Sequence, residues 1–288
     1  MPKFTLICFI FTLLIGVLPA AEEMVLALDR LEDLTQFRSF ADSEDPSLKD
    51  LQASASAQFT EIGLLKLKEK YASKSLMVVD LRRESHGFVD GLPISWFLWD
   101  TNWSNIGLSI EEISHNEDSR LALLRREKKI TIQRISIMEN KRIRIPIPVT
   151  VTSTATESNL AAREGLGYLR VPISDHKAPE VAQINQIITL FKTKPSSGWL
   201  HFHGKTGRGR TAVILAMWDM LHNAKKDSFE NILAREEIFS SYNIKTNSID
   251  GPYFTEKEMG LYILKSFYEY CRSNKNDYTT PFDITVVN

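Results

Sequence analysis

Cysteine is almost absent from this chain of 288 residues and occurs only at positions 8 and 271. Cys8 lies in a leading apolar segment that we expect to be removed, so the mature chain would keep one thiol and form no internal disulfide. Cys271 lies within an apolar helical pattern, and buried thiols are usually inert. The sequence therefore favours a packed core thiol at Cys271 rather than a reactive one.

Long apolar runs are also lacking beyond the first residues. The chain begins MPKFTLICFIFTLLIGVLPAAEE, with one basic residue, an apolar run over 4–18 and small residues before two glutamates. This pattern is typical of a secretory signal peptide, residues 1–21, and the run is short for a spanning helix, although an uncleaved anchor is the alternative. We expect an exported protein, periplasmic or secreted, with no stable membrane insertion after cleavage.

Neither sign of charge dominates the chain, whose formal net charge is −1. This balance identifies no partner, and no nucleic-acid partner is expected; the oligomeric state is not predicted. Charge is uneven only over residues 120–144, where nine basic residues stand against Glu127 and Glu139. That segment either attracts a polyanion or forms the solvated face of a sheet, and the sequence leaves both interpretations open.

The apolar pattern predicts an α/β protein. A continuous apolar run over residues 76–81 is typical of a buried parallel strand. The polar residues RRESHG follow directly, at the end of the strand where ligands collect in open α/β sheets. Further strands are predicted at 168–173 and 198–203, each followed by a helix. We expect a central, mostly parallel sheet flanked by helices.

A small β-rich region is predicted in the middle of the chain, because residues 128–137 and 142–153 alternate between apolar and polar residues. Pro146 and Pro148 cannot donate a ladder hydrogen bond, so their strand must lie at an edge or contain a bulge. The expected organisation is a signal peptide (1–21), a lead-in and first part of the core (22–100), the β-rich subdomain (101–155), the remaining core (156–274) and an extended tail (275–288).

The glycine-rich stretch HFHGKTGRGRT, residues 201–211, joins a predicted strand to a predicted helix. It does not fit the nucleotide-binding pattern G-x-x-x-x-G-K-[ST], because five residues separate Gly198 from Gly204 where four are required. A metal site built from His201, His203 and His176 lacks a carboxylate or cysteine at a recognisable ligand spacing. We expect no metal and no other cofactor.

Capture of an oxyanion accounts for the whole stretch. Gly207 and Gly209 allow successive backbone N–H groups to point inward, and the helix that follows adds its positive end. Arg210 can then bind two phosphate oxygens with its planar guanidinium. The predicted phosphate-binding residues are Lys205, Thr206, Gly207, Arg208, Gly209 and Arg210.

The same stretch resembles the signature H-C-x-x-G-x-G-R-T of cysteine-dependent phosphatases of the tyrosine-phosphatase superfamily. In particular, the chain is similar to the bacterial tyrosine-phosphatase-like phytases, which remove phosphates from inositol hexakisphosphate. The motifs VVDLRRESHGFVDGLPISWF, YLRVPISDHKAP and WDMLHNAKKDSFENILAREE occur in the expected order, and QFRSF corresponds to an amino-terminal arginine segment. The resemblance covers roughly residues 35 to 272. It implies a tyrosine-phosphatase-like core with a partial barrel beside it.

One position departs from this family pattern. The resemblance places the nucleophilic cysteine at Gly204, the general acid at Asp175 and the remaining catalytic positions at Arg210 and Thr211. Glycine offers no electron pair, so the family's covalent cysteinyl-phosphate route is closed. The predicted substrate rim, drawn from several motifs, consists of Arg38, Arg82, His86, His176 and His203.

Three functions remain open at this level. The first is a pseudophosphatase that binds inositol polyphosphate or another phosphoester without turnover. The second is an active phosphatase in which His203 replaces the nucleophile, Asp175 activates water, or Gly204 stands where the native chain has cysteine. The third is a structural or partner-binding protein whose loop holds an anion for stability.

Overall fold

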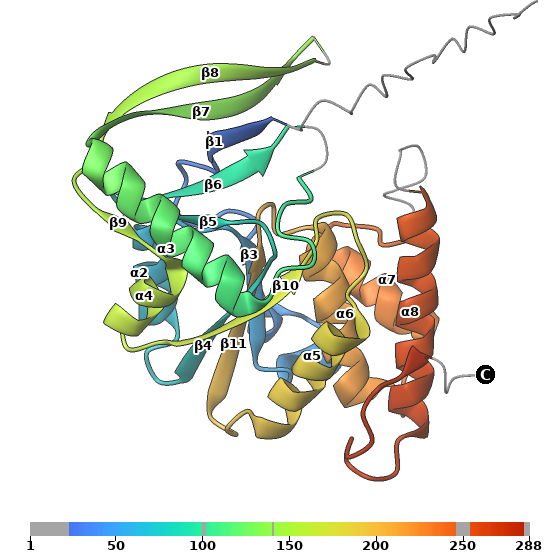
Figure 1. Cartoon of the computed structure of the whole chain (residues 1–288). Coiled ribbons are helices and arrows are strands. Elements are labelled where there is room, and N and C mark those ends of the chain that lie inside the picture. The colour runs from blue at the N-terminus through green and yellow to red at the C-terminus, as the bar shows by residue number, and fades with distance from the viewer. Residues whose placement is uncertain (1–22, 100–101, 140, 246–253, 285–288) are drawn as a thin grey trace, which may run out of the picture.

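The computed structural model describes residues 23–99, 102–139, 141–245 and 254–284 (Figure 1). The predicted signal peptide lies outside these residues. Among the helices described, none is both long and apolar enough to cross a bilayer.

A five-stranded sheet forms the centre of the larger layer. Its strand order is β10 (Gly167–Ile173), β4 (Ser75–Arg82), β11 (Gly198–Gly204), β3 (Ala53–Ala57) and β2 (Arg38–Ser39). The first four strands are parallel, and only β2 runs antiparallel to its neighbour. The predicted α/β class with a mostly parallel central sheet is therefore confirmed.

Helices cover both faces of this sheet (Figure 1). On one face, the main apolar cluster includes side chains from α5 (Val181–Thr193), α6 (Gly209–Asn223), α7 (Phe229–Ser240) and α8 (Phe254–Ser273). On the other face, α2 (Glu61–Lys70) and α4 (Glu157–Arg163) contribute to a smaller cluster. Strand side chains alternate between the two faces, both of which are covered, so β4 and β11 are buried nearly throughout.

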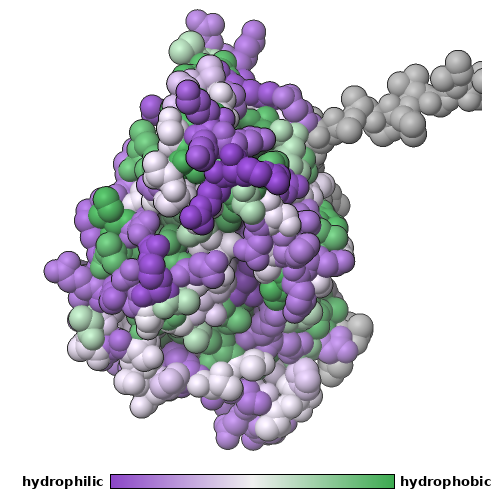
Figure 2. Space-filling view, turned by 60° about the vertical axis from the view of Figure 1, so that its left-hand side comes forward, coloured by the Kyte–Doolittle hydropathy of each residue, from purple (hydrophilic) through white to green (hydrophobic). Residues whose placement is uncertain are grey.

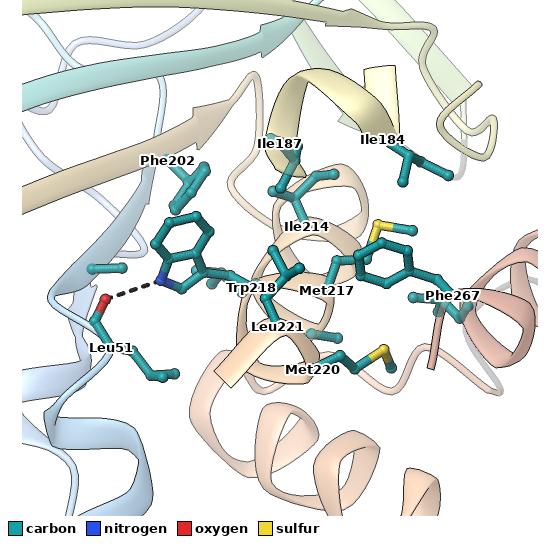
Figure 3. Close-up of a cluster of buried hydrophobic side chains, with 14 of the residues drawn as sticks. Leu51, Ile184, Ile187, Phe202, Ile214, Met217, Trp218, Met220, Leu221 and Phe267 are labelled. Carbon is teal, nitrogen blue, oxygen red and sulfur yellow. Dashed lines mark hydrogen bonds between the residues drawn. The ribbon is translucent and has the colours of Figure 1, made fainter. Parts of the chain in front are cut away.

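The main cluster is organised around α6, whose apolar residues run almost all the way round the helix. Trp218 lies within it, and its ring is tilted against that of Phe202 from β11 (Figure 3). Its indole N–H donates to the carbonyl oxygen of Leu51 at 2.9 Å (Figure 3), which satisfies the polar end of a fully buried ring. Because α6 is packed on all sides, it gives rigid support to the loop that precedes it.

The second sheet has six strands and lies above the first in Figure 1. Its order is β8 (Lys141–Thr150), β7 (Lys129–Met138), β1 (Met24–Leu28), β6 (Leu92–Leu98), β5 (His86–Val89) and β9 (Thr154–Ala155). Three of these strands precede residue 101, so the β-rich region predicted at 101–155 is only part of the sheet. The predicted region also contains a long helix, α3 (Ile110–Glu127), which the alternation pattern did not reveal.

The two prolines of β8 lie where their chemistry requires. β8 is an edge strand that pairs only with β7, with Pro146 opposite Gln133 and Pro148 opposite Thr131. The prediction of an edge strand is therefore confirmed. A strand without these N–H groups also makes a poor template for a further strand.

The described part of the tail predicted at 275–288 packs against the core. In the described part, 275–284, the Phe282 side chain is buried in the main cluster. The Tyr278 hydroxyl donates to the carbonyl oxygen of Leu221, and Asn185 donates to that of Phe282. This segment folds back over α5 and α6 because its aromatic residues complete their core. Cys271 is buried, as expected, and burial raises the pKa of its thiol.

Strongly hydrophilic side chains gather over the upper part of the molecule in Figure 2, where β7, β8 and the end of α3 lie in Figure 1. Several of the predicted basic residues contact aromatic rings there. The guanidinium carbon of Arg144 lies 4.0 Å from the centre of the Trp99 ring, and that of Arg120 lies 5.4 Å from Trp96. These cations at least have a structural role, covering aromatic side chains of the second sheet.

Candidate functional site

The glycine-rich loop and the segment of the predicted acid line one cavity of about 290 Å³. The loop follows β11 and leads directly into α6, while the acid segment follows β10. Both therefore lie beyond the carboxyl ends of parallel strands on either side of β4, at the edge where open α/β sheets bind ligands. The structure brings together Asp175, His176 and all the residues from Gly204 to Thr211.

The loop backbone has the form expected of an anion nest. Gly207 has a φ of +68°, and a Cβ there would lie 2.4 Å from the backbone nitrogen of Ala57. Only glycine fits this position, because the loop packs directly on β3. Within the described residues, the backbone N–H groups of 206–208 have no hydrogen-bond acceptor. These donors and the start of α6 remain available to an anion.

Two arginines from the amino-terminal segment hold the loop from behind. Arg30 Nη2 donates to the carbonyl oxygen of Lys205 at 2.9 Å, and Arg38 Nη1 donates to that of Gly207 at 2.9 Å. Because neither Arg30 nor Arg38 lines the cavity, the two carbonyl groups that accept these bonds face away from it. Arg38, predicted at the substrate rim, therefore contacts the loop backbone.

Arg210 is held by a residue that the sequence analysis did not select. Its guanidinium donates to both carboxylate oxygens of Glu84, at 2.7 and 3.0 Å, and to the carbonyl oxygen of Ile173. Burial lowers the pKa of Arg210, but Glu84 and Asp175 outweigh it, so the pKa lies above its ordinary value. Glu84 lies within the RRESHG motif, and its position at the end of β4 was the available signal.

Asp175 forms an ion pair with Arg210 at the cavity, with 3.4 Å between its Oδ1 and Arg210 Nη2. Asn102 Nδ2 donates to the other carboxylate oxygen at 3.1 Å, and the Trp103 indole donates to the backbone oxygen of Asp175 at 2.7 Å. The segment after β6 thus fixes the acid segment from outside. Neither Asn102 nor Trp103 belongs to a motif that sequence reasoning could single out.

The Lys205 side chain turns toward the second sheet. Its ammonium lies 3.2 Å from Asp29 Oδ1 and 4.4 Å from the centre of the Phe97 ring. Burial of Asp29 raises its pKa, but Arg82 and Lys205 more than offset this and lower the pKa to about 2. Lys205 is therefore paired with a carboxylate of the protein, while Thr206 and Arg208 are exposed on the loop.

Three residues predicted at the substrate rim lie inside the protein instead. Arg82 is completely buried and donates to Asp29 and Gln58, and His86 lies behind it against Asp80. His203 Nε2 lies 2.6 Å from Glu157 Oε1. The period of two along β11 points His203 toward the α2 and α4 face of the sheet, away from the loop. Of the predicted rim, only His176 lines the cavity.

The paired histidines of β11 do not form a metal centre. Ser54 and Ser56 contact the two ring nitrogens of His201 at 3.0 and 2.9 Å, and burial lowers its pKa well below the usual value. Across the described parts of the chain, no group of three or more His, Cys, Asp or Glu residues is arranged to hold a metal ion.

The family of the chain follows from comparison with known proteins. A family model for the tyrosine-phosphatase-like (PTP-like) phytases matches residues 79–222, which is half of the chain. The description of this family is inositol hexakisphosphate. The chain belongs to the PTP-like phytase family. The matched residues contain the acid segment, the phosphate loop and Glu84.

Solved structures of this family share the fold. The PTP-like myo-inositol phosphatase of Mitsuokella multacida, in complex with myo-inositol-(1,3,4,5)-tetrakisphosphate, has a TM-score of 0.81 and 26% identity over 90% of this chain and 46% of its own. A PTP-like phytase from Bdellovibrio bacteriovorus has a TM-score of 0.70 and 26% identity over 88% of this chain and 90% of its own.

The chain is also similar to a protein that is not named as a phytase. The effector protein hopD2 of Pseudomonas syringae pv. tomato is 27% identical over 239 residues, 80% of this chain and 50% of that protein. The chain thus spans about half the length of hopD2 and of the Mitsuokella protein.

Position 204 of this PTP-like phytase family member would take a Cβ with only a small shift of one neighbour. A Cβ built on Gly204 lies 3.3 Å from Thr211 Oγ1 and 3.9 Å from Arg210 Nε, with no closer contact. The φ of Gly204 is not positive, so its backbone suits any residue. Thr211 Oγ1 is buried and has no hydrogen-bond partner within the described residues. A hydroxyl without an acceptor thus faces the point where a side chain at 204 would begin.

Proposed function

We propose that this protein binds phosphate monoesters in the loop 204–211 and does not hydrolyse them through a covalent intermediate. The observation that carries the proposal is the pairing of a complete phosphate cradle with Gly204, which has no nucleophile. A Cβ at position 204 would need Thr211 Oγ1 to move by only a few tenths of an ångström. A PTP-like phytase with this arrangement keeps its binding groups and lacks the attacking atom.

The charges of the site favour a phosphate dianion. The N–H groups of 206–208, the start of α6 and the Arg210 guanidinium all present positive potential to the cavity. No thiolate is present at position 204 to repel a bound dianion, which in a phosphatase opposes ground-state binding. The expected consequence is affinity without turnover.

The other groups near the loop are poor substitutes for the missing thiolate. His203 is buried and bound to Glu157, and Cys271 lies in the main apolar cluster. Asp175 could activate a water molecule only after release from Arg210 and Asn102, which both stabilise its carboxylate. These contacts make the alternative of an active phosphatase with a replacement nucleophile less favourable.

The organic group of the ester is not fixed by the loop. The Mitsuokella neighbour is in complex with an inositol tetrakisphosphate, which supports a phosphoester ligand. Inositol polyphosphate, expected from the sequence, stays a prediction. Export through residues 1–21 also stays a prediction, which detection of the processed chain outside the cytoplasm would test.

The deciding experiment compares the natural protein with Gly204→Cys and Gly204→Ala. Phosphate release from inositol hexakisphosphate and from p-nitrophenyl phosphate is measured for each, and binding of inorganic phosphate is recorded by calorimetry. We expect binding by all three proteins and release by the cysteine variant alone. Gly204→Ala is the matched control, because it adds the same Cβ without a thiol.

Arg210→Ala completes the design. It should abolish phosphate binding in the natural protein and turnover in the cysteine variant, since both depend on the guanidinium. Release of phosphate by the natural protein, at a rate that Arg210→Ala abolishes, would show that another nucleophile acts and that the proposal is wrong.

A further inference from the structure

We propose that the hairpin formed by β7 and β8 binds reversibly to the surface of an anionic lipid membrane. This inference goes beyond the proposed phosphate-binding function and does not depend on it. It concerns the outer half of the hairpin, residues 134–138 of β7 and 141–145 of β8, which pair with one another. The outer half contains four of the nine basic residues found over 120–144, namely Arg134, Lys141, Arg142 and Arg144.

The two halves of the hairpin differ in how the rest of the protein covers them. In the inner half, residues 129–133 and 146–150, Ile130 and Ile132 are buried in an apolar cluster with side chains of α3. No side chain of the outer half belongs to an apolar cluster of the described residues. The exposed fractions are 78% for Ile137, 59% for Met138 and 41% for Ile145. Apolar surface therefore stays exposed along the top of the molecule in Figure 1.

The exposed apolar side chains lie on both faces of the hairpin. Successive side chains of a strand point to opposite faces, so Ile137 and Met138 lie on different faces. Ile145 pairs with Arg134 and therefore shares the face of Met138. A flat protein partner would cover only one face of such a ribbon, whereas lipid headgroups and the upper acyl chains surround an inserted tip.

Each face also places an apolar side chain beside a basic one. Four of the five cross-strand pairs of the outer half have this composition: Arg134 with Ile145, Ile135 with Arg144, Ile137 with Arg142, and Met138 with Lys141. Side chains directly opposite one another on two strands are neighbours. This combination suits an anionic membrane surface, because cations bind the lipid phosphates while apolar groups enter the boundary of the acyl chains.

Within the described residues, two of the four cations of the outer half are held by other groups and two are not. Arg144 forms an ion pair with Glu23, and Arg142 contacts aromatic rings at the end of β6. Lys141 and Arg134 have no hydrogen-bond or ion-pair partner among the residues that the structure describes. At least these two cations are available to anionic headgroups.

The charge of the outer half selects among the possible occupants of this surface. Its ten residues contain no carboxylate, and Glu139, between the two strands, is the neighbouring acidic residue. Like charges oppose the approach of a second copy through the same surface. The formal net charge of the whole chain is −1, so attraction to an anionic membrane would have to come from this local surface.

The backbone limits how deeply the hairpin can enter a membrane. β8 is an edge strand, and its outward N–H and C=O groups need water or headgroups as partners. The hairpin would therefore rest at the level of the headgroups, with side chains such as Ile137 and Met138 reaching the acyl chains. Binding of this kind is reversible and weakens as salt screens the attraction.

The test measures cosedimentation of the protein with vesicles of phosphatidylglycerol or of phosphatidylcholine at low ionic strength. We expect roughly tenfold or tighter binding to phosphatidylglycerol, since each available cation contributes about fivefold near an anionic surface. The double variant Ile137→Ser with Met138→Ser should lose most of the binding. Arg134→Gln with Lys141→Gln should lose the preference for phosphatidylglycerol.

Matched control variants change the same kinds of residue elsewhere. Ile238→Ser shortens an isoleucine of α7 that is 83% exposed, and Lys49→Gln with Lys275→Gln removes two exposed positive charges. Neither control should change vesicle binding more than about twofold, because the attraction is local. All variants are compared in the same chain, so any contribution of residues 1–21 is common to them. Unchanged thermal unfolding excludes a loss of folding as the cause.

A fluorescent label locates the contact directly. Met138→Cys, labelled with a dye sensitive to polarity, should shift its emission to the blue when phosphatidylglycerol vesicles are added. The same dye at Ile238→Cys should show no shift. Both proteins also carry Cys8→Ser, and Cys271 is buried, so the dye reacts at the introduced position.

Other results would overturn the inference. Equal binding to the two lipids, or undiminished binding by the serine variant, would contradict it. Binding of soluble heparin that the serine variant retains, without binding to vesicles, would assign the surface to a soluble polyanion. A dimer in sedimentation velocity that the serine variant dissociates would assign it to a second copy of the chain. Phosphate binding at the loop should be unchanged in every variant, so these results leave the proposed function untouched.

Discussion

The two sides of the phosphate loop differ in how completely the protein specifies them. Behind the loop, every cation has a fixed partner: Arg30 and Arg38 hold backbone oxygens, Glu84 holds Arg210, and Asp29 holds Lys205. In front, Gly204 contributes no side chain and Thr211 Oγ1 has no partner among the described residues. The difference indicates that the fold of the loop does not depend on the group at position 204.

Among the residues behind the loop, Glu84 should be the most sensitive to substitution. Glu84→Ala leaves Arg82 and Arg210 buried without their shared carboxylate, and breaking a buried ion pair costs about 3 to 5 kcal/mol. We expect a large loss in the free energy of unfolding, measured in urea, together with loss of phosphate binding. Glu84→Gln keeps the shape and should cost less. An unchanged Glu84→Ala protein would contradict the pairing with Arg210.

Gly207 should tolerate substitution poorly because it packs on β3 with a positive φ. Gly207→Ala adds backbone strain and overpacking, which together cost about 3 kcal/mol. The midpoint of urea unfolding should fall, and calorimetry should show weaker phosphate binding. Gly209→Ala is the control, since its Cβ meets only the Tyr242 hydroxyl and ring, the nearest atom at 3.3 Å. Equal effects of the two variants would contradict a special role for Gly207.

Asp29, behind the loop, should make the stability of the protein depend on pH in the acid range. Its pKa falls from an ordinary value of 3.8 to about 2 in the folded protein, which corresponds to about 2.5 kcal/mol. Because the folded pKa is the lower one, this stability is present above pH 4 and disappears as the pH falls toward 2. In urea unfolding, Asp29→Asn should therefore be less stable than the natural protein at pH 7, with the gap narrowing below pH 4. A gap that does not change with pH would contradict the pairing.

A substitution at the front of the loop should change the free energy of unfolding least. Gly204→Ala adds a Cβ in a space that accepts it and restricts the unfolded chain, so the free energy of unfolding should change by less than about 1 kcal/mol. Thermal unfolding of the natural and variant proteins checks this. A loss as large as that of Gly207→Ala would remove the contrast between the two sides and would show that Gly204 is required by the fold.

Much of the fold could be read from local patterns. An apolar run identified β4 as a buried parallel strand, β11 was predicted as a strand before the glycine-rich loop, and the prolines of β8 placed that strand at an edge or a bulge. The second sheet was harder to predict, because β1 pairs with β7 across about a hundred residues and no local pattern encodes that pairing. The helix α3 was missed for a related reason: the strong alternation that follows it dominated the interpretation of the region.

For the site, the sequence predicted which residues the loop contains but not which way its neighbours point. Arg82, His86 and His203 are residue types typical of a phosphate rim, yet all three are buried. Asn102 and Tyr242 line or support the cavity, although they lie in unremarkable segments. Side-chain direction at a strand end depends on which face the opposing helices cover, and that is a property of the assembled core.

By itself, the sequence determined the α/β class, the glycine-rich loop before α6 and the lack of a nucleophile at position 204. Each depends on residue types at fixed spacing along a continuous stretch, where backbone geometry alone sets the outcome. Only the tertiary structure decided that Glu84 and Asp29 neutralise the cations behind the loop and that apolar side chains such as Val213 and Leu261 line the cavity. Those partners are far apart in the chain, and they meet only because packing of the two sheets and α6 to α8 brings them together.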